Sequence, residues 1–269
     1  MTEFLPLQDG TRLHFVRRSG LGETLVFIHG LTDNARSFGR VARALGGYFD
    51  FVSYDLRGHG QSDEPSTPNY ETADHANDLL QLTRTLQLSD IVLVGHSLGA
   101  EIALEVERQE PALVRTMVLV DPPWQTDWVG VPNERRRLAA MSWREWIRRL
   151  QSLPLQQVVQ QGHDDMPEWD AEDVLNWAVA KHECRLAALD SVLAVRRRFE
   201  ESVSDISCST LLVTGETRRG AHVTPTMAAV AKRITPKLGV ANIEGAGHGI
   251  HRDQFDTFVK VLKAFLRER

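Results

Sequence analysis

The amino-acid sequence predicts an α/β protein with a doubly wound, mostly parallel sheet and a helical cap inserted after the sixth strand. Short apolar runs alternate with amphipathic helical patterns toward both ends of the chain, which is typical of parallel strands covered by helices on both faces. Between residues 122 and 205 this alternation stops and only helical patterns occur. We therefore predict a core of residues 1–121 and 206–269, and a cap of residues 122–205.

The core elements follow from their apolar patterns. Two antiparallel strands, at 3–7 and 12–18 around a Gln8–Thr11 turn, open the chain. Further short strands follow at 24–28, 50–54, 91–94, 116–120, 210–214 and 238–243. Helical periodicity predicts helices between them, at about 35–45, from a Thr72 cap onward, directly after residue 97, from about 225, and at 253–266.

Three helices are expected in the cap. Ser142 and Glu145 form a capping-box pattern that predicts the start of a short helix, which Pro154 ends. Asp170 is the expected cap of a second helix that runs to about Lys181. A third is predicted over residues 184–198.

Composition excludes several classes of function. The 269 residues are 42% hydrophobic and 25% charged, with a net charge of −5, so there is no basic excess to bind nucleic acid. No apolar run is long enough to span a membrane, and the first residues lack the pattern of a signal peptide. Two cysteines form no disulfide framework. We therefore expect a cytoplasmic protein with a small-molecule substrate and neither a nucleic-acid nor a membrane partner.

The strongest chemical motif is Gly95-His96-Ser97-Leu98-Gly99, between an apolar strand and an amphipathic helix. In this strand–turn–helix context Gly-x-Ser-x-Gly is typical of a nucleophile elbow, in which a sharp turn exposes the serine hydroxyl. Ser97 is therefore the predicted nucleophile.

A serine nucleophile needs a base, and His248 is the best candidate. It follows Gly245-Ala246-Gly247 in a loop between the last strand and the last helix, and histidine titrates near neutral pH. The near competitor, His251, falls at the start of the predicted final helix.

With these motifs in order, the chain resembles the α/β-hydrolase superfamily, in its small capped branch of esterases, lactonases and haloperoxidase-like proteins. Besides the elbow and the His248 loop, the resemblance rests on two motifs, His29-Gly30 and the stretch Asp55-x-Arg57-Gly58-His59-Gly60-x-Ser62. It implies an oxyanion hole formed by the backbone N–H groups of Leu31 and Leu98. It implies no metal or organic cofactor.

The third member of the triad departs from the usual pattern of the family. The acid normally follows the strand after the cap, but Arg218 occupies that position in Thr214-Gly215-Glu216-Thr217-Arg218. Some relatives carry the acid one strand earlier, which here is Asp121, at the carboxyl edge of the sheet where active sites of open α/β sheets collect. We predict Asp121 as the acid, with Glu216 as the alternative; Asp121 could also simply terminate its strand.

The cap carries the expected substrate pocket. All six tryptophans lie between residues 124 and 177, and Trp124 is the one predicted to line the pocket, although short helices also need tryptophan for their own core. Arg218 and Arg219 could contact an acidic substrate or the acidic stretch 164–173, or belong to a solvated loop.

These residues predict a serine hydrolase that cleaves a small, partly apolar carboxylic ester or lactone through an acyl-enzyme. The alternatives are amide or carbon–carbon bond hydrolysis, cofactor-free oxygen chemistry on the same triad, and a small-molecule receptor.

Overall fold

A computed structural model describes residues 2–124, 133–194 and 197–267. Its centre is an eight-stranded sheet with the order β1-β2-β4-β3-β5-β6-β7-β8. β1 and β2 are antiparallel to their neighbours, and β3 to β8 run parallel. The strands are β1 (Thr2–Pro6), β2 (Arg12–Arg18), β3 (Thr24–Ile28), β4 (Asp50–Tyr54), β5 (Ile91–His96), β6 (Val114–Val120), β7 (Ser209–Thr214) and β8 (Leu238–Asn242). The predicted mostly parallel sheet is confirmed.

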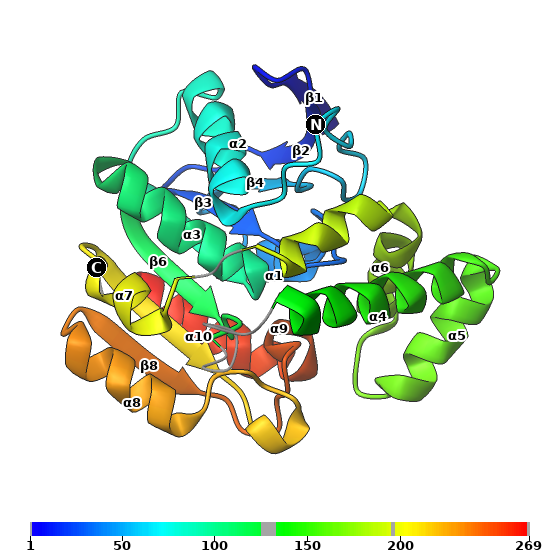
Figure 1. Ribbon diagram of the computed structural model, residues 1–269. Helices are drawn as coiled ribbons and strands as arrows, with labels where there is room; N and C mark the ends of the chain where they lie inside the picture. Colours follow the sequence, from blue (N-terminus) through cyan, green and yellow to red (C-terminus); the bar gives the residue numbers. More distant parts are fainter. Residues whose placement is uncertain (1, 125–132, 195–196, 268–269) are drawn as a thin grey trace.

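Helices cover both faces of the sheet (Figure 1). Along β5, Ile91 and Leu93 join the cluster under one set of helices, while Val92 and Val94 join the cluster under the other, as the two-residue repeat of a strand requires. The first set is α2 (Thr72–Thr85), α3 (Leu98–Gln109) and α8 (Pro225–Ile234). The second is α1 (Gly39–Leu45), α9 (Ile250–Asp253) and α10 (Phe255–Arg267). Strands buried on both faces explain why they read as unbroken apolar runs.

A helical segment is inserted between β6 and β7. It contains α4 (Asn133–Gln151), α5 (Leu155–Asp165), α6 (Ala171–Glu183), the 3₁₀ helix η3 (Leu186–Val192) and α7 (Phe199–Ser204). Two further 3₁₀ turns, η1 (Pro111–Leu113) and η4 (Thr217–Arg219), lie in the core. The first three inserted helices form a small cluster of their own around Leu150, Val158 and Trp177. In contrast, Phe199 and Val203 of α7 pack in the core beneath the α2–α3 face.

Helix boundaries in the inserted segment differ from the prediction. The capping-box pattern at Ser142 does not begin a helix, because Ala140 and Ile147 are both fully buried on one continuous face of α4. In place of the helix expected at 184–198 the described residues form the shorter η3, and α7 begins only at Phe199. Arg185 N–H donates to Gly58 O (2.8 Å) in the core. α5 was not predicted. The helix capped by Asp170 is confirmed, since its side chain accepts from Glu172 N–H.

Two core helices also begin elsewhere than expected. Glu71, not Thr72, caps α2, and it forms a capping box with Asp74. The helix predicted at 253–266 corresponds to α10, which begins two residues later, and the short α9 precedes it.

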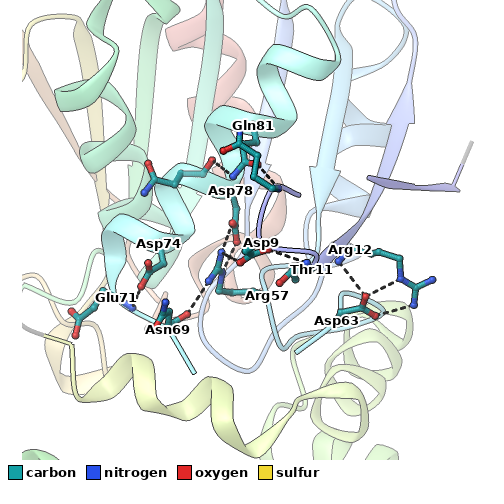
Figure 2. A network of polar contacts seen from close by, with 12 residues as sticks. Asp9, Thr11, Arg12, Arg57, Asp63, Asn69, Glu71, Asp74, Asp78 and Gln81 are labelled. Carbon is teal, nitrogen blue, oxygen red and sulfur yellow. Dashed lines mark hydrogen bonds and ion pairs between the residues drawn. The ribbon is translucent and has the colours of Figure 1, made fainter. Parts of the chain in front are cut away.

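Arg57, from the motif that follows β4, holds the loops at the α2 side of the sheet together (Figure 2). Its Nε donates to Asp78 on α2 (2.6 Å), its Nη1 to Asn69 O (3.1 Å), and its Nη2 to Asp9 (3.3 Å). Arg57 and Asp78 are both buried. Burial raises the pKa of Asp78 to about 6, although Arg57 opposes this change. The pair therefore stabilises the fold only while both partners are present.

Replacing Arg57 by Met should lower the free energy of unfolding by about 3–5 kcal/mol, because it leaves the Asp78 carboxylate buried without a partner. Arg12→Met is the matched control: its pair with Asp63 (2.8 Å) is exposed and should matter little. The double variant Arg57→Met, Asp78→Leu should recover part of the loss. Chemical denaturation of the four proteins tests this, and equal effects of the two single variants would contradict it.

Candidate active site

Ser97 lies on the turn between β5 and α3, with a backbone φ of 53° and ψ of −119°. This sparsely populated conformation is typical of a nucleophile elbow. The flanking glycines are required by close approach: a Cβ on Gly95 would lie 2.2 Å from Gly99 O, and one on Gly99 would lie 2.1 Å from Ile28 O. The strand can therefore turn into the helix this sharply only with glycine at both positions.

Two backbone N–H groups are available beside Ser97. Leu31 and Leu98 line the same cavity as Ser97, and neither N–H has a hydrogen-bond acceptor within the described part of the chain. Leu98 N–H is at the first position of α3, where no intrahelical acceptor exists. His29 fixes the loop that carries Leu31, since its Nε2 accepts from Leu56 N–H (3.0 Å) and its Nδ1 donates to Gly30 O (2.8 Å). The predicted pair of donors thus shares a cavity with Ser97.

The structure brings Asp121 and His248 together. His248 Nδ1 lies 2.6 Å from Asp121 Oδ2. Asp121 is fully buried at the end of β6, with a positive φ of 43°, and its two oxygens accept N–H groups of His222 (2.8 Å) and Val223 (3.0 Å). The carboxylate is thus fixed from three sides and can hold the imidazole in one orientation.

Glu216, the alternative acid, faces elsewhere. Its carboxylate pairs with Arg218 Nε (2.7 Å) and accepts Gly245 N–H (3.1 Å). It therefore supports the loop that leads to His248 rather than the imidazole itself. Arg218 is largely exposed. Arg219 pairs with Glu168 of the inserted segment (2.8 Å), which is the contact with the acidic stretch 164–173 that the sequence suggested as one alternative.

Ser97 and His248 line the same cavity, although their side chains form no hydrogen bond within the described residues. Catalytic contacts of this kind often tighten only when substrate binds. His96 fixes the backbone of His248, because its Nε2 donates to His248 O (2.9 Å). His251, the competing base, is buried outside this cavity, and burial lowers its pKa well below the usual range.

The cavity has a volume of about 560 Å³. The tryptophans that line it come from the inserted helices and the loop before α6: Trp143, Trp146, Trp169 and Trp177. Trp124 is not among its lining residues; its ring stacks on Phe199, 5.5 Å away, in the core cluster. The neighbouring Pro123 does line the cavity. The prediction of Trp124 as a pocket residue is thus not supported, and Trp128 lies outside the described residues.

Sequence reasoning missed three charged residues in the cavity wall: Asp33, Lys181 and Arg252, each 3–5% exposed. Arg252 pairs with Asp33 (2.8 Å). Lys181 Nζ donates to Thr32 O (2.8 Å) and Thr32 Oγ1 (3.0 Å). No sequence signal distinguishes them, because Lys181 looks like an ordinary basic residue near a helix C-terminus.

Burial sets the protonation of these charges. It lowers the pKa of Lys181 to about 8, although Asp33 opposes the change. Burial alone would raise the pKa of Asp33, but the charges of Arg252 and Lys181 hold it below the usual range. Lys181 and Asp33 are therefore both charged at neutral pH.

Comparison with known proteins identifies the family to which the chain belongs. The alpha/beta hydrolase family matches residues 25–261 of the chain. This chain belongs to the alpha/beta hydrolase family. It is 30% identical over 267 residues to N-formylmaleamate deformylase of Pseudomonas putida, which covers 96% of this chain and 94% of the relative. It is 27% identical over 263 residues to 2-(acetamidomethylene)succinate hydrolase of Mesorhizobium japonicum, with 93% and 90% covered.

Solved structures agree with this family. The crystal structure of E-2-(acetamidomethylene)succinate hydrolase matches with a TM-score of 0.81 and 25% identity, covering 99% of both chains. The resemblance expected from the motifs is confirmed, and the relatives named here are hydrolases. Within the described residues no helix is long and apolar enough to cross a membrane.

The geometry predicts that Asp121→Asn lowers kcat by roughly 10³–10⁴-fold, because an amide cannot hold His248 in the tautomer that accepts a proton at Nε2. Glu216→Gln is the matched control: it keeps an oxygen to accept Gly245 N–H and should retain most of the activity. Steady-state kinetics on a chromogenic ester compare the two. A larger loss in Glu216→Gln would instead assign the acid to Glu216.

Proposed function

We propose that this chain is a serine hydrolase that cleaves a small carboxylic ester or N-acyl amide through an acyl-enzyme. The observation that carries the proposal is the hydrogen bond from His248 Nδ1 to buried Asp121 (2.6 Å), at a cavity that also contains Ser97. This arrangement supplies a nucleophile, a base and the group that orients the base.

The proposed reaction uses these groups in two halves. His248 Nε2 accepts the proton of Ser97 Oγ as the oxygen attacks the substrate carbonyl, and the N–H groups of Leu31 and Leu98 donate to the resulting oxyanion. His248 then protonates the leaving alcohol or amine, which departs and leaves the acyl group on Ser97. In the second half His248 takes a proton from water, the hydroxide attacks the acyl-enzyme, and Ser97 recovers its proton as the acid product leaves.

The relatives bear on the bond that is cleaved. Both names, N-formylmaleamate deformylase and 2-(acetamidomethylene)succinate hydrolase, contain an N-acyl group. This supports including amides beside the esters and lactones expected from the sequence, since the same acyl-enzyme chemistry serves all of them. We further propose that the inserted helices α4 to α6 act as the cap, because their tryptophans line the cavity over Ser97.

A fluorophosphonate should label the protein at Ser97, and Ser97→Ala should abolish both labelling and the turnover of p-nitrophenyl acetate and p-nitroacetanilide. Ser152→Ala is the control, because Ser152 lies on the surface after α4, with its hydroxyl bonded to Arg149 O (2.7 Å). It should label and turn over like the unaltered protein. Peptide mapping locates the adduct. Labelling that persists in Ser97→Ala would contradict the assignment of the nucleophile.

A further inference from the structure

The cavity wall carries an excess of positive charge. Lys181 and Arg252 are cationic and Asp33 is anionic, and all three are buried. Removing a charge from water costs several kcal/mol unless an opposite charge compensates it. Arg252 is compensated by Asp33 at 2.8 Å. Within the described residues, Lys181 has no carboxylate at ion-pair distance, and the cavity wall holds two cationic side chains to one anionic side chain.

Lys181 also has donor capacity to spare. An ammonium group has three N–H donors, and Thr32 accepts two of them through O (2.8 Å) and Oγ1 (3.0 Å). The rings of Trp177 and Trp146 lie 5.2 and 5.7 Å from Nζ. These rings exclude water and favour a cation, but they accept no conventional hydrogen bond. Two of the three donors are therefore accounted for, and Lys181 lines the cavity, so a group in the cavity is a natural acceptor for the third.

Arg252 adds a second positive charge to the same wall. Its Nη2 pairs with Asp33, while its Nε is buried without an acceptor among the described residues. The guanidinium lies 5.0 Å from the ring of Trp169, which also lines the cavity. Hydrogen-bond donors in such a wall are normally satisfied, so the spare N–H of Lys181 favours an acceptor that enters with the substrate, and the positive charge of Arg252 in the same wall favours an anionic one.

We propose that Lys181, assisted by Arg252, binds a carboxylate of the substrate, so that the enzyme selects esters or amides with a second, anionic end. This inference rests on the proposed function and adds the substrate class. A carboxylate carries one negative charge, which matches the excess of one cationic side chain in the cavity wall. A phosphate carries up to two negative charges and matches it less well. Thr32 directly follows Leu31, whose N–H is a proposed oxyanion donor. The carboxylate site and the site of the reacting carbonyl are therefore formed in part by the same loop.

The alternative is that Lys181 only fixes the Thr32 loop. A neutral donor could do this without burying a charge, whereas the structure retains a cation whose pKa of about 8 keeps it protonated at neutral pH. Charge-assisted hydrogen bonds in a site with little water are strong, so a carboxylate at this position should dominate substrate preference.

The test compares two chromogenic esters that differ only at the far end: mono-p-nitrophenyl glutarate, with a carboxylate, and p-nitrophenyl valerate, with a methyl group. The unaltered enzyme should prefer the glutarate ester in kcat/KM, and Lys181→Met should lower that preference by about tenfold to a hundredfold. Lys181→Arg should retain much of it. Arg218→Gln, which removes a cation that lies outside the cavity, should leave the preference unchanged.

Binding to an inactive variant separates the two proposals. Glutarate should bind to Ser97→Ala in calorimetry, and Lys181→Met in the same background should abolish the heat of binding. If Lys181→Met does not fold by circular dichroism, Lys181→Gln, which keeps a donor for Thr32, replaces it. Binding without turnover of either ester would uphold this inference while overturning the proposed function. Equal preference in all variants, with no binding of glutarate, would overturn the inference alone.

Discussion

The hydrogen bond between Asp121 and His248 connects two parts of the chain that are 127 residues apart. Asp121 is fully buried, and a buried carboxylate is stable only when its oxygens are bonded. The N–H groups of His222 and Val223 provide part of that bonding, and the imidazole completes it. This bonding holds three segments together at the carboxyl ends of the parallel strands: the end of β6, the segment after β7 and the loop after β8. Ser97 lies at the same end of the sheet.

This geometry favours Asp121 over Glu216 as the proposed acid. Glu216, after β7, is tied to Gly245 and Arg218 and so stabilises the loop that presents His248. Asp121, one strand closer to the elbow, contacts the ring itself. The carboxylate after β6 thus contacts the imidazole ring of His248, whereas the carboxylate after β7 contacts the backbone of the loop that carries His248. The histidines around the site complete the support: His96 holds the carbonyl of His248, and His29 holds the loop of Leu31.

Much of the core could be predicted from the sequence, because strands buried on both faces must be apolar throughout and the elbow needs glycine at fixed positions. The inserted helices were harder to predict. Ser142 carries a strong local capping signal, but the buried face of α4 continues through it, so tertiary packing overrides local preference.

The cavity wall could not be predicted for a related reason. Trp124 and Trp177 have equivalent sequence signals, yet Trp124 packs on Phe199 and Trp177 lines the cavity. Lys181 meets Thr32 across 149 residues, and Arg252 meets Asp33 across 219. Such partners are set by how the inserted helices sit on the core, for which a single sequence offers no local pattern.

The bond between His248 and Asp121 can be observed directly by proton NMR on protein with ¹⁵N-labelled histidine. A hydrogen bond to Asp121 predicts a strongly deshielded proton on His248 Nδ1, which is present in the unaltered protein and in Glu216→Gln and is absent in Asp121→Asn. A resonance that survives Asp121→Asn and disappears in Glu216→Gln would rule out Asp121 and place the orienting carboxylate after β7.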